Sequence, residues 1–572
     1  MSIDLSLDRI KRLLGVLAYT RPTIHIAGTN GKGSVCALVS SILTAAEPAL
    51  AIGRFNSPHL ISVLDSISIK NRPISEEAYF SAKETVERTD KENAIGASNF
   101  ELLTCTALVA FEHAAVDVVI LEVGMGGRLD ATNAVSDDSI LVSALTAVDL
   151  DHQAFLGNTV GAIAREKSAI SRPGRPFVIG PQVHPEATDV ARSVVAAVGG
   201  EVIPLPIVTR ANWDDALDGP PPPRDSAFEG ASPRLVQVSM ACFTEPIRAL
   251  LPLHGAHQLA NLRVAAGIIS AVLTHPSCEK FGLGLRDRIT PTAVARGIAN
   301  TRWPGRLSYH TLTLPAQAPA EPSGAQKLLV LADGAHNPAS ATALAEYLTE
   351  LLGESPQGTP SRPLVLTFVL ALSHSPPKTP AQILAPLFAL HERLPRGRQV
   401  RIGAALLCFT PPAGMPWVRP EPPSVIRAAI STLVPSPGST IDLWPDSDAN
   451  EAEAAGKSET GAPAPLERAL RWAAGRHAAG REDALVVLAG SLYLVADFYR
   501  LLASLGQAQE IWGCELRGLR PARARARCQR DGGADARSCC PLTRAFSAGI
   551  WQCSDGGGLG TEKQQRQARF PQ

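Results

Sequence analysis

The chain has 572 residues, of which 45% are hydrophobic, and its 54 basic and 54 acidic side chains give a formal net charge of zero. This length exceeds what one hydrophobic core supports and predicts two domains plus extensions. The balanced charge gives no field for nucleic acid, no apolar run suits a membrane span, and residues 1–14 lack the apolar segment of a signal peptide. We therefore expect an intracellular, cytoplasmic protein that binds neither nucleic acid nor membrane, with a mitochondrial pool as an alternative.

The first strong pattern is an apolar run, Thr23–Ala27, followed by a glycine loop, Gly28–Ser34, and an amphipathic helix. Backbone N–H groups of such a loop bind phosphate oxygens, Lys32 adds positive charge, and the Ser34 hydroxyl suits Mg²⁺. The spacing departs from G-x-x-x-x-G-K-[ST], because the loop is shorter and Gly33 separates the lysine from the serine. We interpret it as a phosphate site; a ligand-free turn is the alternative.

Alternating strand and helix patterns fill the first half of the chain. The predicted strands are Thr23–Ala27, Asp117–Val123, Ile140–Val148 and Pro176–Gly180, and the predicted helices are Glu76–Arg88, Phe100–Glu112, Thr159–Ile170 and His257–Leu273. Apolar runs without polar alternation are typical of a parallel sheet buried on both faces, so we predict an α/β domain over residues 1–300. Residues 211–232 contain four consecutive prolines and predict an exposed insertion.

Two of these strands end in side chains that suit a metal. Glu122 ends the second strand and His152 follows the third, and the carboxyl ends of parallel strands are where open α/β sheets bind ligands. Because Mg²⁺ prefers oxygen ligands, Glu122 is a candidate ligand beside Ser34, and a glutamate that caps a turn is the alternative. Lys167 would repel Mg²⁺ as an ammonium, so it serves either as a counter-charge or, after carbamylation, as an oxygen ligand.

A second series of patterns begins after Thr301 and predicts another α/β domain over residues 301–505, with the boundary near Ala299–Trp303. The predicted strands are Lys327–Asp333, Pro363–Leu372, Gln399–Leu407, Ser439–Leu443 and Ala484–Ala489, and a helix is predicted at Pro338–Leu352. Residues 445–465 read as a second exposed insertion. Residues 506–572 are rich in arginine, glycine and cysteine without apolar periodicity, which predicts disorder; an arginine-rich nucleic-acid tail and a non-native coding segment are the alternatives.

Eight motifs follow one another in order between about residues 5 and 505. They are Ala27–Ser34, Ser57–Leu60, Glu122–Asn133, Leu156–Thr159 with Glu166–Lys167, His257–Asn261, Trp303–Arg306, Asp333–Pro338 and Gly490–Tyr493. Together they resemble the folylpolyglutamate synthase/dihydrofolate synthase family of the Mur ligase superfamily, and Phe100–Ala107 and Gly414–Trp417 resemble its fungal dihydrofolate synthase branch. The resemblance implies two Rossmann-like parallel-sheet domains, of the Mur ligase central and C-terminal types, followed by the tail.

The resemblance also implies the residues that bind ATP and metal. The ATP-binding positions are Asn30, Gly31, Lys32, Gly33, Ser34, Asn261, Arg306 and Asp333. Two Mg²⁺ ions are held by Ser34, Glu122, His152 and carbamylated Lys167, and K⁺ is a further candidate cofactor. The chain has Ser168-Ala169 after this lysine, where the family usually has Ala-Gly.

The substrate positions are likewise implied by the resemblance. Pterin contacts map to Ser98, Asn99, Phe100, Glu101, Leu129, Asp130 and Ala131. Ser57, Pro58 and His59 belong to a mobile loop over the substrate, and His336 and Ser491 are candidates for the glutamate or acyl-phosphate region. For Phe100, core packing at a helix start is the alternative. The catalytic set is Lys32, Glu122, Lys167 and His336.

The activity that the resemblance implies is ATP-dependent ligation of L-glutamate to 7,8-dihydropteroate through an acyl phosphate, by a monomer. The first alternative is a folylpolyglutamate synthase or bifunctional enzyme that adds glutamate to tetrahydrofolate; Asn30 and Glu101 favour the dihydrofolate synthase form. The second is a nucleotide-binding module without catalysis. A cell-wall Mur ligase fits the fold alone.

Overall fold

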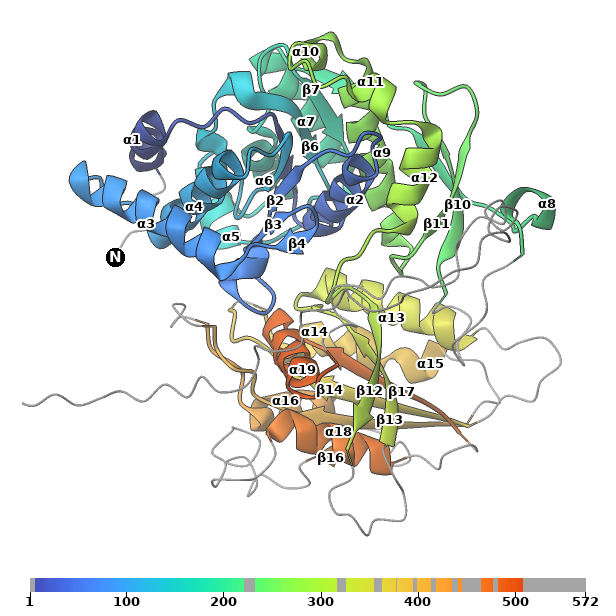
Figure 1. The fold of residues 1–572 in the computed structure, drawn as a ribbon. Coiled ribbons are helices and arrows are strands. Elements are labelled where there is room, and N and C mark those ends of the chain that lie inside the picture. Colours follow the sequence, from blue (N-terminus) through green and yellow to red (C-terminus); the bar gives the residue numbers. More distant parts are fainter. Residues whose placement is uncertain are drawn as a thin grey trace, which may run out of the picture. The chain divides into compact units, whose positions relative to one another are not determined.

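The computed structural model describes residues 6–220, 232–315, 326–353, 363–376, 378–393, 399–412, 418–434, 441–444, 464–476 and 482–507. Two large sheets and one small sheet organise these residues (Figure 1). We call the elements up to residue 299 the first lobe, those from residue 308 the second lobe, and residues 300–307 the linker. Both lobes belong to one compact unit, Met1–Glu515, and the domain limits predicted at residues 300 and 505 stay predictions.

The first lobe is built on an eight-stranded sheet with the order β4-β3-β2-β5-β1-β6-β7-β8. The strands are β1 Thr23–Ala27, β2 Ile52–Phe55, β3 Ile67–Ile69, β4 Arg72–Pro73, β5 Val118–Glu122, β6 Ile140–Leu145, β7 Pro176–Ile179 and β8 Glu201–Ile203. In the order of the sheet, the neighbouring strands β2, β5, β1, β6, β7 and β8 pair in parallel. At the edge of the sheet, β2 pairs with β3 and β3 with β4 in the antiparallel direction. The strand order reverses at β1, so its carboxyl end is the switch point where such sheets bind ligands.

Helices cover both faces of this sheet, as the apolar runs predict (Figure 1). The long ones are α1 Asp8–Leu17, α2 Lys32–Thr44, α3 Glu76–Glu92, α4 Asn99–His113, α6 Val160–Ser168, α7 Pro185–Val198, α9 His257–Thr274 and α12 Pro291–Ala299; the short ones are α5 Gln153–Leu156, α10 Pro276–Glu279 and α11 Leu285–Arg288. Helices α2, α9 and α12 share one apolar cluster, whereas α1, α3 and α4 pack into another, and α6 and α7 into a third. Helix α2 is buried over most of its surface because α9 and α12 pack on the side that the sheet leaves free.

A three-stranded antiparallel sheet, which the sequence patterns did not reveal, packs beside α9 and α12. It consists of β9 Ile207–Arg210, β10 Arg234–Ser239 and β11 Ile247–Leu251. The insertion predicted at 211–232 begins between β9 and β10 and includes α8 Asp215–Asp218, which Arg248 of β11 ties to the sheet through a 2.6 Å ion pair with Asp218. Residues 221–231 lie outside the described part of the chain.

The second lobe has a six-stranded sheet with the order β12-β13-β17-β14-β15-β16, parallel except for β12. The strands are β12 Ser308–Leu314, β13 Gln326–Ala332, β14 Leu364–Leu370, β15 Val400–Leu406, β16 Asp442–Trp444 and β17 Asp483–Ala489, and the helices are α13 Pro338–Gly353, α14 Pro380–Phe388, α15 Leu390–Arg393, α16 Pro423–Leu433, α18 Pro465–Gly475 and α19 Leu492–Ser504. The two apolar clusters of this lobe separate α13, α14 and α16 from α18 and α19. Residues 414–417, 445–463 and the tail from 508 onward lie outside the described residues.

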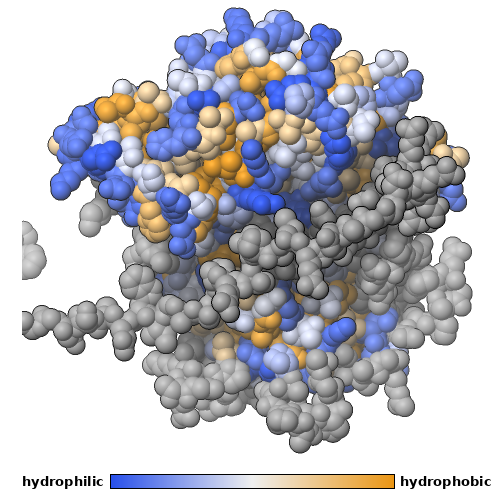
Figure 2. All heavy atoms as spheres, viewed as in Figure 1, coloured by the Kyte–Doolittle hydropathy of each residue, from blue (hydrophilic) through white to orange (hydrophobic). Residues whose placement is uncertain are grey.

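Within the described ranges, no helix is both long and apolar enough to cross a bilayer. On the face that Figure 2 shows, hydrophilic and hydrophobic residues are interspersed. The α/β class with two largely parallel sheets is confirmed.

The packing of α12 on α2 generates a stability prediction. A Cβ atom added to Gly297 would lie 2.9 Å from the backbone nitrogen of Ile42 and 3.0 Å from the carbonyl oxygen of Ser41. We expect Gly297→Ala to destabilise the protein by about 1–3 kcal/mol, because backbone cannot move aside as a side chain can. Gly15→Ala, in helix α1 with nothing within 4 Å, is the matched control and should stabilise slightly. Thermal denaturation compares them, and equal melting temperatures would contradict the prediction.

Candidate functional site

The glycine loop begins where β1 ends and is attached to the neighbouring strand β6. The N–H groups of Thr29 and Asn30 donate to the carbonyl oxygen of Ala147 at 2.8 and 3.1 Å, and the Thr146 hydroxyl donates to the Asn30 carbonyl at 2.7 Å. A Cβ atom on Gly28 would collide with that hydroxyl. Glycine is therefore required at this position, and the attachment fixes the loop above the sheet edge.

Lys32 and Ser34 stand at the start of α2, as predicted. The Lys32 ammonium donates to the carbonyl oxygens of Gly28 and Thr29 at 3.1 and 3.3 Å, so its charge stays over the loop. Ser34 is only 5% exposed, and its hydroxyl accepts a 3.3 Å hydrogen bond from Gln258 of α9. The lysine charge and the serine oxygen thus lie where a helix N-terminus favours an anion.

Asn261 of α9 lies against the glycine loop. Its side-chain nitrogen donates to Gln258 at 2.9 Å, and a Cβ atom on Gly31, whose φ is 92°, would collide with its side-chain oxygen. A Cβ atom on Gly33 would likewise collide with the aromatic ring of Trp303, which lies in the linker. The glycines therefore allow α9 and the linker to approach the loop closely.

Glu122 ends β5, beside β1, and is 6% exposed. Its carboxylate accepts hydrogen bonds from the Asn56 side chain at 2.6 Å and from the Ser57 backbone N–H. Burial raises the pKa of Glu122, while the positive charges of Lys32 and Arg306 act in the opposite direction. A buried carboxylate that depends on nearby positive charge is a suitable metal ligand, because a cation removes the cost of burying it.

Lys167 lies on α6 and is 2% exposed. Burial, reinforced by the charge of Lys32, lowers the pKa of Lys167 to about 7. A large share of this amine is therefore uncharged near neutral pH, and the uncharged amine is the form that reacts with CO₂ to give a carbamate.

His152 precedes α5 in the left-handed backbone region with φ 52°, and its side chain is 48% exposed. Partial removal from water lowers the pKa of His152; the charges of Lys167 and Lys32 act in the same direction, and Asp151 opposes them. The neutral imidazole is the form that binds a metal. Asp149, three residues before His152, exchanges two 3.1 Å hydrogen bonds with the Thr29 hydroxyl, which places this segment beside the glycine loop.

Of the four predicted pterin-site residues Ser98–Glu101, three are exposed or half-buried. Ser98 and Glu101 form a capping box at the start of α4. The Ser98 hydroxyl accepts from the Glu101 N–H, and the Glu101 carboxylate accepts from the Ser98 N–H at 2.7 Å and from Arg9 at 3.1 Å. Asn99 is exposed at the same helix start. The structure thus gives Glu101 a capping role, and its pterin contact stays a prediction.

Phe100 and Asp130 meet at the turn after β5. The Phe100 ring reaches to within 2.5 Å of the position that a Cβ on Gly124 would take. Asp130 is buried and accepts hydrogen bonds from the Met125 N–H at 2.8 Å and from the Thr132 hydroxyl at 2.6 Å. Burial raises the pKa of Asp130. Leu129 is half-buried and Ala131 buried beside it; this turn is therefore shaped by Asp130, and its pterin contacts stay predictions.

The linker and β13 supply Arg306 and Asp333. Asp333 is 8% exposed and accepts from the backbone N–H groups of Leu307 and Ala335, both at 2.8 Å. Burial raises the pKa of Asp333, and Arg306 opposes this rise as it does at Glu122. The charge of Arg306 therefore acts on carboxylates of both lobes, although the sequence gives these residues no common motif.

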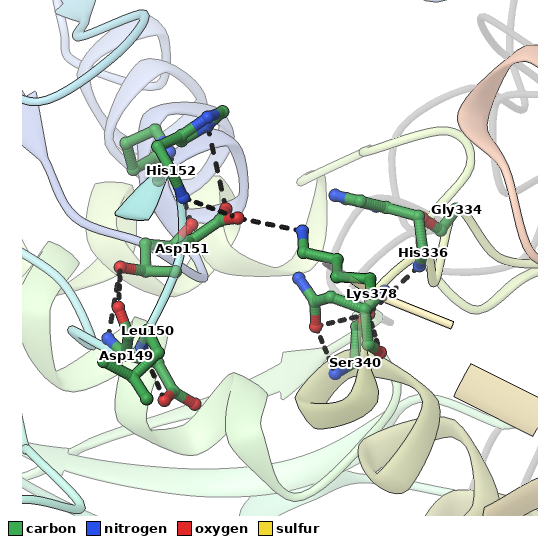
Figure 3. A network of polar contacts seen from close by, with 11 residues as sticks. Asp149, Leu150, Asp151, His152, Gly334, His336, Ser340 and Lys378 are labelled. Carbon is green, nitrogen blue, oxygen red and sulfur yellow. Dashed lines mark hydrogen bonds and ion pairs between the residues drawn. The ribbon is translucent and has the colours of Figure 1, made fainter. Parts of the chain in front are cut away.

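Figure 3 shows a polar network that the sequence analysis missed. Lys378, which follows β14, donates to Asp151 at 2.9 Å, and Asp151 is also 3.7 Å from the His152 ring. Burial alone would raise the pKa of Asp151, but His152 and Lys378 lower this pKa to about 2. The predicted His336 lies in this network, with Nδ1 2.8 Å from the Gly334 carbonyl. No sequence pattern points to Lys378, because its partner Asp151 is 227 residues away.

Ser491 is 1% exposed and its hydroxyl accepts from the Tyr493 N–H at 3.2 Å, so it caps α19. Ser57, Pro58 and His59 follow directly on Asn56, and burial lowers the pKa of His59. The roles proposed for these residues in substrate binding stay predictions.

In the described ranges, no group of three or more His, Cys, Asp or Glu side chains is arranged to hold a metal. The predicted donor set has a different composition: the Ser34 hydroxyl, the Glu122 carboxylate, the His152 ring and a carbamate on Lys167. Nucleotide phosphate oxygens would complete such a set, and hard oxygen donors fit Mg²⁺. The residues therefore fit the ion, provided that the lysine is modified.

A glycine loop at the switch point of a parallel sheet, with a buried carboxylate on the next strand, defines an α/β protein that binds nucleotide phosphates. Residues 317–501 match the family described as "Dihydrofolate synthetase, C-terminal domain". The chain is 31% identical over 505 residues to the dihydrofolate synthetase of Saccharomyces cerevisiae, covering 88% of this chain and 98% of that protein. It is 29% identical to the probable dihydrofolate synthetase of Schizosaccharomyces pombe, over 88% of this chain and 99% of the relative.

Among solved structures, Mycobacterium tuberculosis folylpolyglutamate synthase complexed with ADP is similar, with a TM-score of 0.61, 27% identity, and coverage of 87% of this chain and 95% of that one. The chain belongs to the dihydrofolate synthase/folylpolyglutamate synthase family. The resemblance predicted from the eight motifs is confirmed.

The contact between Gly31 and Asn261 generates a binding prediction. We expect Gly31→Ala to weaken ATP binding by about tenfold or more, because the added methyl group displaces either Asn261 or the loop. Gly174→Ala is the matched control, because Gly174 has φ 62° but nothing within 4 Å. Both variants should lose roughly 1 kcal/mol of stability from left-handed strain. Isothermal titration with Mg-ATP distinguishes them, and equal affinities would refute the role of the contact.

Proposed function

We propose that this protein ligates L-glutamate to 7,8-dihydropteroate and forms 7,8-dihydrofolate, ADP and phosphate. The observation that carries the proposal is the Lys32 ammonium held over the glycine loop, with the Glu122 carboxylate buried at the end of a neighbouring strand, in a chain that matches yeast dihydrofolate synthetase over nearly its full length. These groups suit transfer of a phosphoryl group to a carboxylate, since they supply positive charge and oxygen ligands where charge develops.

In the first step, the pteroate carboxylate attacks the γ-phosphorus of ATP, and ADP leaves. The glycine loop binds the phosphates through its backbone N–H groups, and Lys32 holds its charge over them. Asn261, Arg306 and Asp333 are proposed to contact the rest of the nucleotide. Phe100, with Asp130 behind the turn after β5, is proposed to hold the pterin, which would orient the carboxylate toward the loop.

Ser34, Glu122, His152 and carbamylated Lys167 are proposed to hold two Mg²⁺ ions, and K⁺ remains a further candidate. When bound there, Mg²⁺ would supply positive charge to the phosphate oxygens. The chain prepares this site by burying Glu122 next to hydrogen-bond donors and by keeping the Lys167 amine substantially uncharged.

In the second step, the α-amine of L-glutamate attacks the acyl phosphate carbonyl and expels phosphate. His336 and Ser491, in the second lobe, are the proposed residues of this region, and Lys378 lies in the network that includes His336 (Figure 3). The proposed partners are dihydropteroate, L-glutamate and ATP. A monomeric state and a cytoplasmic location, with a mitochondrial pool as the alternative, stay predictions.

A second candidate activity is addition of glutamate to tetrahydrofolate. Escherichia coli dihydrofolate synthase/folylpolyglutamate synthase, whose name combines both activities, is 31% identical over 352 residues, covering 61% of this chain and 68% of that protein. The two activities use the same phosphoryl chemistry and differ in the carboxylate that is activated.

The first test of the proposed function compares the two acceptors. We expect L-glutamate-dependent ADP release with dihydropteroate and little with tetrahydrofolate, measured by a coupled ADP assay at equal substrate concentrations. Turnover of both acceptors would establish the bifunctional activity. ATP binding without ADP release in any pterin and glutamate mixture would instead establish a nucleotide-binding module.

Glu122→Gln tests the metal role directly. We expect a loss of about 100- to 1,000-fold in kcat, because an amide cannot supply the ligand charge that phosphoryl transfer needs. Since burial raises the pKa of Glu122, the neutral replacement should leave the melting temperature unchanged or higher. Glu112→Gln is the control, because Glu112 pairs with Arg21 at 2.7 Å outside the site. Wild-type turnover of Glu122→Gln would refute the assignment.

A further inference from the structure

A short segment links Glu122 to the second lobe. We call residues 57–62 the bridging loop; they follow Asn56 at the end of β2 and lead toward β3. The loop contains the family motif Ser57–Leu60, and the side chains that hold its two ends, those of Glu122, Asp65 and Arg500, lie outside that motif.

The inner end of the bridging loop holds the Glu122 carboxylate. Asn56 is 5% exposed, donates to Glu122 at 2.6 Å, and has its own backbone N–H bound to the Ser66 carbonyl at 2.9 Å. The Ser57 backbone N–H donates to the same carboxylate. The orientation of Glu122 therefore depends on where two consecutive residues of this segment stand.

A single carboxylate fixes the shape of the loop. Asp65 accepts from the backbone N–H groups of Leu60, Ile61 and Ser62 at 2.6, 2.7 and 2.9 Å. Three N–H groups on one carboxylate give a compact turn that moves as a unit, because a shift of any one residue breaks a charge-assisted bond. Asp65 is followed by Ser66, whose carbonyl accepts from the Asn56 N–H, so a displacement of residues 60–62 reaches Asn56 through this carboxylate.

The outer end of the bridging loop rests on the second lobe. Leu60 and Ile61 pack against the apolar cluster that includes α18 and α19. Arg500 of α19 donates from one nitrogen to the Ile61 carbonyl at 2.9 Å and from the other to Asp497 at 2.8 Å. Asp497 in turn accepts from the Thr410 N–H at 2.8 Å. Arg500 is thus held by its own lobe while it binds the backbone of the other.

We propose that Arg500 is a positioning residue, which holds the bridging loop so that Asn56 and Ser57 keep Glu122 in its ligand orientation. This inference rests on the proposed function, since it assigns Glu122 to the metal. Arg500 touches neither substrate nor the reacting atoms. Its effect reaches them through the loop, so contact between the lobes and metal binding are coupled.

The kinetic test uses Arg500→Met, which keeps the alkyl chain and removes the donors. We expect the Mg²⁺ concentration for half-maximal activity to rise about tenfold and kcat to fall, because loss of a charge-assisted bond is on that scale. Arg471→Met is a matched control: Arg471 of α18 also binds one carboxylate, Glu467 at 2.7 Å, and one backbone carbonyl, Pro315 at 2.9 Å. This control should leave the Mg²⁺ dependence unchanged.

Two further variants separate positioning from general stability. Arg500→Lys, which retains a cationic donor, should recover part of the Mg²⁺ affinity. In an Asn56→Ala background, which lacks the bond to Glu122, Arg500→Met should change the Mg²⁺ requirement by less than about twofold, since residues that act along one path are not additive. Fully additive effects would overturn the proposed path.

Hydrogen exchange of the full chain tests the docking independently of activity. The amides of Leu60 and Ile61 should exchange faster in Arg500→Met and at the wild-type rate in Arg471→Met. If the wild-type protein releases no ADP with dihydropteroate, the proposed function fails, and the exchange rates still decide whether Arg500 holds the loop. If the wild type is active and the two methionine variants share one Mg²⁺ dependence, the inference is overturned.

Discussion

The attachment of the glycine loop to strand β6 is the constraint on which the site depends. The Ala147 carbonyl and the Thr146 hydroxyl hold the loop from below, and Asn261 closes on it from α9. None of these contacts leaves room for a side chain at positions 28 and 31. The loop is therefore preorganised, so little ordering has to occur when phosphate arrives.

Burial makes the charges at this edge of the sheet interdependent. Burial raises the pKa of Glu122 and of Asp333, and the charge of Arg306 opposes both rises. Lys167, in contrast, has a pKa lowered by burial and by Lys32. In this water-poor environment burial disfavours the charged form of each of these groups, and an opposite charge nearby restores it. The site thus favours an occupant that brings both negative phosphate charge and cations. A metal–nucleotide complex brings both, whereas a free anion brings only negative charge.

Much of this arrangement could be predicted from the sequence, because it depends on local patterns. The limits of β1 and the start of α9 were predicted to the residue, since apolar runs and turn glycines mark them. Asn56 and Lys378 could not be predicted, because their partners are 66 and 227 residues away and carry no local signal. Strands β9 to β11 could not be predicted, because their alternation of buried and exposed residues is short. Glu101 is predicted to bind the pterin, and the structure shows that it also completes a helix cap.

At Gly127, the turn after β5, which is proposed to bind the pterin, packs tightly against helix α6, which carries Lys167. A Cβ there would lie 2.7 Å from the Glu166 carbonyl oxygen and 3.0 Å from the Lys167 Cα, and the adjacent Arg128 N–H donates to the Glu166 carbonyl at 2.9 Å. The turn that is proposed to bind the pterin therefore rests directly on the backbone of Lys167, whose amine is proposed to be carbamylated. Evolution of a new acceptor preference through insertions in this turn would shift the lysine at the same time. Changes of specificity in this fold should instead accumulate in segments that do not touch α6.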